Sequence, residues 1–151
     1  MDIGTVKKVI QELMESKHGL TGAEIGKNHV IAIYLFGSLA KGTEKVRSDI
    51  DLAFVFDERF YKEDPFRALQ EAELLGSEIS KKMHKAVDVV ILNGSSLSFA
   101  YYTVRNGLCL YESSAVNRIL YEVTLDNKYQ DFMPFIKDLR EAKRKALIGR
   151  D

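Results

Sequence analysis

A short polar segment between two apolar runs constrains the fold of this chain more than any other feature. The first run, residues 30–36, is short and rich in β-branched residues, which predicts a strand buried on both faces. The second run, residues 52–56, forms the body of another predicted strand over residues 49–57. Gly37-Ser38 ends the first strand, and Asp49 and Asp51 begin the second. A glycine–serine turn and two aspartates are therefore expected at strand ends.

Asp49 and Asp51 occupy alternate positions of their predicted strand. Their side chains should lie on one face, about 6.6 Å apart along the strand. Two carboxylates on one face repel each other, and a hard divalent cation such as Mg²⁺ would compensate because it prefers oxygen ligands. The structural alternatives are an edge-strand charge pair or a turn cap.

A third aspartate, Asp88, is embedded in the apolar run of residues 86–92. This run predicts a central strand, in which an isolated charge is costly. If that strand lies beside the second one, Asp49, Asp51 and Asp88 could hold two Mg²⁺ ions about 3.5–4 Å apart, the spacing used for in-line phosphoryl chemistry. The alternative for Asp88 is a hydrogen-bonded aspartate in the core.

The glycine–serine pair has the properties of a phosphate-binding turn. Gly37 lets a phosphate approach the backbone, and Ser38 is predicted to cap a short helix that runs through Lys41 to Gly42. Backbone amides at the start of that helix, together with the Ser38 hydroxyl, can donate to phosphate oxygens. Lys41 or Arg47 could add positive charge.

The remaining pattern alternates helices and strands and predicts a mixed α/β (α+β) fold, a small mixed β-sheet flanked by helices. A helix is expected over residues 2–17, and another begins at Asp64-Pro65 with Phe66 and Leu69 on its apolar face. The later elements are expected to be a helix capped by Ser95 or Ser96, a short strand over 108–111, and helical structure from Ser113 or Ser114 onward, with two apolar stripes separated by Pro134.

Composition narrows the class of protein. A chain of 151 residues suits one domain, and 22 basic residues balance 22 acidic ones, which weakly disfavours direct binding of a nucleic-acid backbone. Cys109 is the one cysteine, so no internal disulfide can form, and a buried thiol is expected. The sequence shows neither an apolar run near 20 residues nor a signal-peptide pattern, so we expect no membrane association and a cytoplasmic location.

Gly37-Ser38, ten residues, Asp49-x-Asp51 and a later Asp88 resemble the signature of the DNA polymerase β-like nucleotidyltransferase superfamily. Residues 36–42 and 48–52 are similar to its minimal nucleotidyltransferase (MNT) branch, with Lys41 where that branch often has arginine. The resemblance implies a nucleotidyltransferase core over residues 1–112 and a helical C-terminal extension of the same domain over 113–151. It also implies ATP as the donor, two Mg²⁺ ions, catalytic and metal-binding roles for the three aspartates, and nucleotide-binding roles for Gly37, Ser38, Lys41 and Arg47.

The helical tail resembles that of the MNT antitoxins, which pair with HEPN-domain toxins. This resemblance implies transfer of AMP from ATP to a tyrosine of a HEPN-family RNase toxin. Three alternatives remain from the sequence: a small-molecule nucleotidyltransferase of the aminoglycoside type, nucleotide addition to nucleic-acid ends, and a non-catalytic antitoxin that masks its toxin by binding. The sequence leaves the acceptor, the base preference and homo-oligomer formation open.

Overall fold

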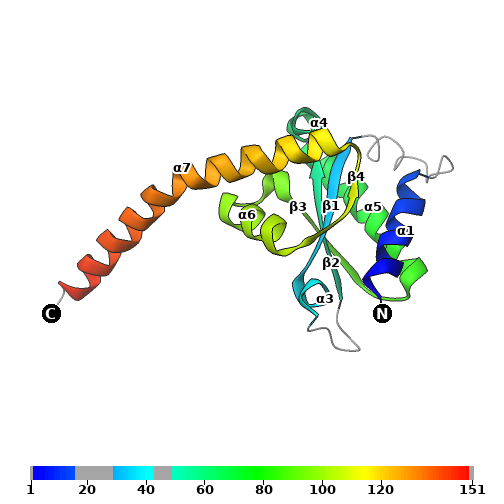
Figure 1. Cartoon of the computed structure of the whole chain (residues 1–151), viewed down its shortest axis with the longest axis horizontal. Helices are drawn as coiled ribbons and strands as arrows, with labels where there is room; N and C mark the ends of the chain where they lie inside the picture. Colours follow the sequence, from blue (N-terminus) through cyan, green and yellow to red (C-terminus); the bar gives the residue numbers. More distant parts are fainter. Residues whose placement is uncertain (1, 16–28, 43–48, 150–151) are drawn as a thin grey trace.

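A four-stranded mixed sheet forms the centre of the protein (Figure 1). The computed structural model describes residues 2–15, 29–42 and 49–149. The strand order is β3-β2-β1-β4; β1 pairs antiparallel with β2 and β4, and β2 pairs parallel with β3. The strands are β1 (Val30–Phe36), β2 (Ile50–Phe56), β3 (Val87–Ile91) and β4 (Leu108–Glu112). A mixed sheet flanked by helices confirms the predicted fold class.

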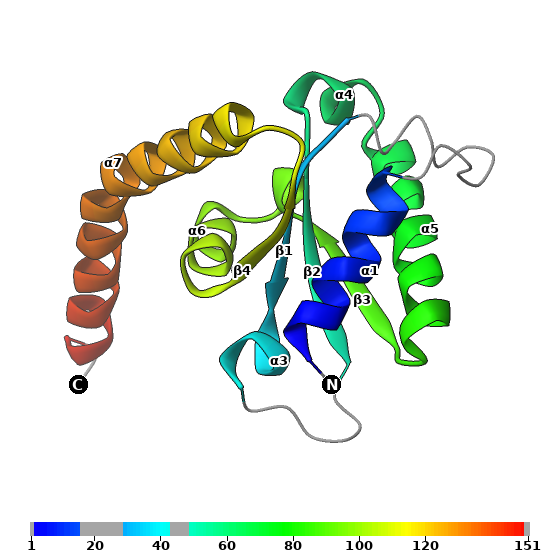
Figure 2. The same cartoon turned by 45° about the vertical axis from the view of Figure 1, so that its right-hand side comes forward.

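Helices α1 (Ile3–Glu15) and α5 (Pro65–Met83) cover one face of this sheet, where Figure 2 shows them side by side. Val6 and Ile10 of α1 are fully buried. They belong to one apolar cluster with Ile79 of α5 and with strand residues such as Leu52 and Phe54. Because successive side chains of a strand point to opposite faces of the sheet, the even-numbered side chains of β2 pack against α1 and α5.

Helix α6 (Leu97–Asn106) and the first half of α7 (Ala115–Ile148) cover the opposite face. Tyr34 and Ala53 of the sheet pack there with Leu125 of α7. The Tyr34 hydroxyl donates a 2.7 Å hydrogen bond to Glu122, which also accepts one of 3.0 Å from Arg118. These polar contacts join α7 to the centre of the sheet.

Helix α7 is a single helix of 34 residues, about 50 Å long at 1.5 Å per residue. Pro134 was expected to separate two helical stripes; it lies inside the continuous helix, which bends in the region drawn in orange (Figures 1 and 2). A proline removes one backbone hydrogen bond and commonly bends a helix without ending it. The second half of α7 extends beyond the sheet (Figure 1).

Side-chain caps fix the starts of several helices. Asp64 accepts a hydrogen bond from the backbone N–H of Arg67 at the start of α5, as predicted. Ser96, rather than Ser95, caps α6, and Ser114, rather than Ser113, caps α7. Each cap satisfies an N–H group that the helix itself leaves free.

Three local predictions were wrong or incomplete. Helix α4 (Glu58–Glu63) was not predicted, and the 3-10 turn η1 (Leu92–Gly94) follows β3. Phe66 and Leu69 were assigned to the apolar face of α5 but are 69% and 38% exposed, because α5 turns Ala68 and Ala72 toward the sheet. No helix in the described ranges has the length and hydropathy needed to span a membrane.

Candidate active site

The turn after β1 forms one wall of the candidate site. Helix α3 (Gly37–Lys41) begins at Gly37, with Phe36 in the N-cap position and no side-chain cap. Ser38 is therefore the second residue of α3, and its predicted role as the N-cap is wrong. Gly42 closes the helix in the left-handed conformation, as its position in the sequence predicted.

Gly37 has two independent reasons to be glycine. Its φ of +77° lies in the left-handed region, which side chains of L-amino acids rarely adopt. A Cβ atom at this position would also overlap Oδ2 of Asp51. The backbone of the turn and the Asp51 carboxylate are therefore in direct proximity, which is the arrangement that a bound phosphate–cation pair requires.

The sheet register places Phe36, Asp51 and Asp88 in one row across three strands. Phe36 of β1 is opposite Asp51 of β2, and Asp51 is opposite Asp88 of β3. Side chains in register on adjacent strands project to the same face, so both carboxylates lie on the face that α6 and α7 cover. Asp49 precedes Asp51 by two residues, just before β2, and its side chain is exposed.

Asp88 lies in a different environment from the one predicted. The apolar run around it predicted a central strand, but β3 is an edge strand and Asp88 is exposed. The costly buried charge predicted from the sequence is therefore absent at Asp88. An open groove of about 640 Å³ also runs along this edge between β3 and α5, on the other side of the sheet from the Asp88 carboxylate, and its walls include Glu73 and Ser77.

The electrostatics of Asp51 show that the three carboxylates act on one another. Burial raises the pKa of the Asp51 carboxyl, and the nearby charges of Asp88 and then Asp49 raise it further. A positively charged ligand would reverse this effect. The three groups therefore form one acidic cluster at the α3 end of the sheet.

A metal was implied by the resemblance, and the donor set fits a hard divalent cation. The candidate ligands are carboxylate oxygens only. Burial and the two neighbouring aspartates raise the pKa of Asp51, and a bound cation would oppose this rise by favouring the charged form. Across residues 2–15, 29–42 and 49–149, no three His, Cys, Asp or Glu side chains stand close enough together to hold a metal ion.

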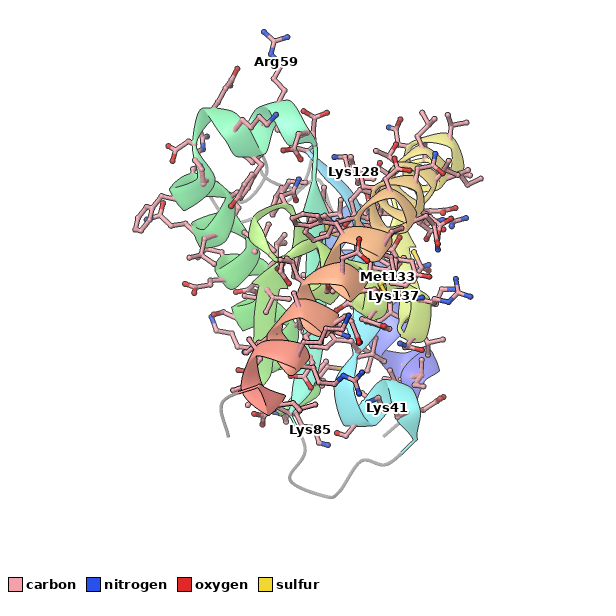
Figure 3. The ribbon with its side chains drawn as sticks, turned by 90° about the vertical axis from the view of Figure 1, so that its left-hand side faces the viewer. Lys41, Arg59, Lys85, Lys128, Met133 and Lys137 are labelled. Carbon is pink, nitrogen blue, oxygen red and sulfur yellow. The ribbon has the colours of Figure 1, made fainter. Side chains whose placement is uncertain are left out.

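Two lysines lie at the same end of the molecule as the acidic cluster. Lys41 is exposed in the last turn of α3, while Arg47 lies outside the described residues. Figure 3 shows Lys85 at the same end of the molecule as Lys41. Lys85 immediately precedes Ala86, whose carbonyl accepts a 2.9 Å hydrogen bond from Ile50 at the start of β2. Lys85 also precedes Asp88 by only three residues.

A cavity of about 670 Å³ lies at the opposite end of the same sheet face. Its walls include Asn93, Tyr121 and Lys128. Asn93 bonds both backbone groups of Phe56 and the Glu58 carboxylate, so it ties η1 to the end of β2. This cavity is separate from the acidic cluster, because β2 reaches the cluster at its first residues and the cavity at its last.

Comparison with known proteins agrees with this geometry. Residues 23–115, more than half of the chain, match the family described as Polymerase beta, Nucleotidyltransferase. The chain is also 37% identical over 84 residues to the protein adenylyltransferase MntA of Aphanizomenon flos-aquae (strain 2012/KM1/D3). That alignment covers 53% of this chain and 55% of the relative, so the chain spans about half the length of the relative it matches.

Solved structures share the fold at low sequence identity. A toxin–antitoxin structure with AMP-PNP contains a chain with a TM-score of 0.56 and 23% identity, covering 80% of this chain and 94% of that one. A tri-AMPylated Shewanella oneidensis HEPN toxin in complex with MNT antitoxin gives a TM-score of 0.57 and 20% identity, with coverage of 91% and 98%. A putative minimal nucleotidyltransferase gives 0.51 and 19%, with coverage of 72% and 95%.

The matched family segment contains the Gly37 turn and all three aspartates, and the sheet brings Asp51 and Asp88 into one row beside that turn. The chain therefore belongs to the polymerase β nucleotidyltransferase family.

Proposed function

We propose that this protein is a Mg²⁺-dependent nucleotidyltransferase that transfers AMP from ATP to a tyrosine hydroxyl of a HEPN-family toxin and so acts as an antitoxin. The observation that carries the catalytic part is the row of Asp51 and Asp88 beside the Gly37 turn. The partner is suggested by the relative named as a protein adenylyltransferase and by the solved HEPN toxin complex with an MNT antitoxin.

The donor would bind at the turn between β1 and β2. The open backbone at Gly37, the Ser38 hydroxyl and the Lys41 ammonium group lie on α3 and would contact the phosphates. Asp49 and Asp51 would hold the cation, and Asp88 would complete its ligand set. Bound Mg²⁺ supplies positive charge that offsets the charge of the triphosphate.

The transfer step uses Asp88 as the proton acceptor. The acceptor hydroxyl oxygen forms a bond to the α-phosphorus, and the bond from that phosphorus to the bridging oxygen of the leaving pyrophosphate breaks. The hydroxyl proton passes to the Asp88 carboxylate. The exposed position of Asp88 on the edge strand suits this role, because a protein acceptor can reach it from outside the sheet.

Masking by binding alone is the second candidate function, and α7 is the observation that favours it. Phe132, Phe135 and Leu139 in its second half are 41–56% exposed. Exposed apolar side chains clustered on one element are typical of protein interaction surfaces. A surface of this kind could hold a toxin without any transfer of AMP.

Incubation with ATP labelled at the α-phosphorus, Mg²⁺ and the HEPN partner distinguishes the two functions. We expect label on the partner with the native protein, and a loss of at least about 100-fold in rate when Asp49 and Asp51 are both changed to asparagine. Glu63→Gln on α4, which removes an exposed carboxylate at the other end of the sheet, is the matched control and should keep full activity. A tight complex that carries no label would refute the transfer and support masking.

A further inference from the structure

An exposed aromatic side chain stands beside the acidic cluster. Phe99 of α6 meets Phe36 edge to face, with ring centroids 5.9 Å apart and planes at 89°. Phe36 is the residue before Gly37 and the neighbour of Asp51 in the sheet register. The side chain of Phe36 therefore lies between Phe99 and the proposed phosphate and cation site.

The position of Phe99 is fixed, but its ring is only partly covered. Its backbone N–H donates to the Ser96 hydroxyl at the start of α6, and the following residue, Ala100, is buried against the sheet. The side chain nevertheless remains 40% exposed. A rigid backbone that holds a large, partly open aromatic ring beside a charged site is suited to binding a flat apolar group.

The chemistry of the donor supplies such a group. A nucleoside triphosphate held by its phosphates at α3 must place its base somewhere near that end of the sheet. Bases have an apolar face that stacks on aromatic side chains, and this contact tolerates different bases because each has a π-face. Phe36 is partly buried under α6, which leaves Phe99 as the more open of the two rings.

We propose that Phe99 is the stacking platform for the base of the bound nucleoside triphosphate. This inference rests on the proposed function, because it assumes a triphosphate at the Gly37 turn. Affinity then depends on the area of the base that stacks on Phe99. Purines have a larger ring system than pyrimidines, so purine triphosphates bind more tightly than pyrimidine triphosphates. Phe99 is a specificity-determining residue and takes no part in the proton transfer.

Binding of ATP and of inorganic tripolyphosphate, each with Mg²⁺, tests the proposal by calorimetry. Phe99→Ala should weaken ATP binding about 5- to 100-fold, the range expected for one lost stacking contact, and leave tripolyphosphate binding unchanged. Phe99→Tyr should restore ATP binding to within about threefold of the native protein. The native preference for ATP over CTP should shrink in Phe99→Ala.

Two further variants test whether a loss of ATP binding is specific to the Phe99 ring. Tyr102→Ala removes another exposed aromatic ring of α6, one that bonds Tyr129 on α7, and should leave both affinities unchanged. Phe99→Leu keeps an apolar contact with Phe36 and should still weaken ATP binding, so the test survives if Phe99→Ala fails to fold.

The outcomes separate this inference from the proposed function. Unchanged ATP binding in Phe99→Ala, or an equal loss of ATP and tripolyphosphate binding, overturns the stacking role while the transferase proposal stands. A native protein that binds neither ligand overturns both. Loss of ATP binding alone, rescued by Phe99→Tyr, supports the platform.

Discussion

At the scale of single residues, the acidic cluster is expected to cost stability in the absence of a cation. The pKa of Asp51 is raised above its usual 3.8 by burial and by Asp88 and Asp49. The folded state therefore binds a proton at Asp51 that the unfolded chain has already released, so stability falls as pH rises through this window. Asp51→Asn removes the charge and should raise the melting temperature of the metal-free protein by roughly 2 °C at neutral pH.

A pH series with differential scanning calorimetry checks this expectation. The difference in melting temperature between Asp51→Asn and the native protein should be small near pH 2.5, where the carboxyl is almost fully protonated in both states, and should grow toward pH 7. A difference that does not change with pH would show that Asp51 is not destabilised by its charge. The same substitution should abolish nucleotidyl transfer, so stability and activity would change in opposite directions.

Several residues of the site could be assigned from sequence because their chemistry is local. Gly37 and the alternation of Asp49 and Asp51 follow from a turn and from the two-residue period of a strand. The environment of Asp88 could not be predicted in this way. Valines on both sides of it predicted burial, but whether a strand is central or at an edge depends on strand order, which is a non-local property.

At the scale of elements, α5 approaches β3 so closely that a glycine is needed between them. A Cβ atom on Gly76 would lie 2.8 Å from Cγ1 of Val89. Alanine at this position would improve helix propensity by about 1 kcal/mol, but overpacking against a strand costs about 1–3 kcal/mol. We expect Gly76→Ala to lower the free energy of unfolding in urea by about 1 kcal/mol.

Gly76→Ala should have the opposite effect on the free energy of unfolding in a protein that already carries Val89→Ala. In Val89→Ala the obstructing methyl group is absent, so Gly76→Ala should raise the free energy of unfolding by about 1 kcal/mol relative to Val89→Ala alone. A stabilising effect in the native background would mean that Val89 moves aside at little cost. The need for glycine at position 76 could not be predicted from the sequence, because the close contact with Val89 is tertiary.

Elements with strong local signals were predicted well, and those decided by tertiary contacts were not. The two apolar runs became β1 and β2, and the Asp64-Pro65 signal gave the start of α5 within one residue. Helix α4 was missed because its residues are mostly polar and none of them is buried. The helical structure predicted from Ser113 or Ser114 onward is confirmed as the single helix α7, which contains Pro134.

At the scale of the whole molecule, the two faces of the sheet have different roles. Helices α1 and α5 close one face with a continuous apolar core, while α6 and α7 cover the other and leave the carboxylate end open. The first half of α7 packs on this same face, and its second half carries the exposed apolar side chains described above (Figure 3). The proposed donor site and the helix that carries the proposed partner surface therefore share one face of the sheet.

Because the site is formed by the end of β1, the start of β2 and β3, a bound donor should stabilise the fold as a whole. A ligand at 100 times its dissociation constant adds about 2.7 kcal/mol to the free energy of unfolding. For a domain of this size, that is a rise of about 5–10 °C in melting temperature. We expect this rise with ATP and Mg²⁺ together in a thermal shift assay without acceptor.

The controls test whether the acidic cluster is responsible for that stabilisation. ATP with a chelator should give little shift, since the carboxylates and the triphosphate repel each other without a cation between them. The double variant Asp49→Asn and Asp51→Asn should also shift by less than about 1 °C, although its metal-free form is expected to be at least as stable as the native protein. An equal shift in the double variant would place the donor elsewhere, and the cavity beside Asn93 and Tyr121 would then be the first site to examine by substitution.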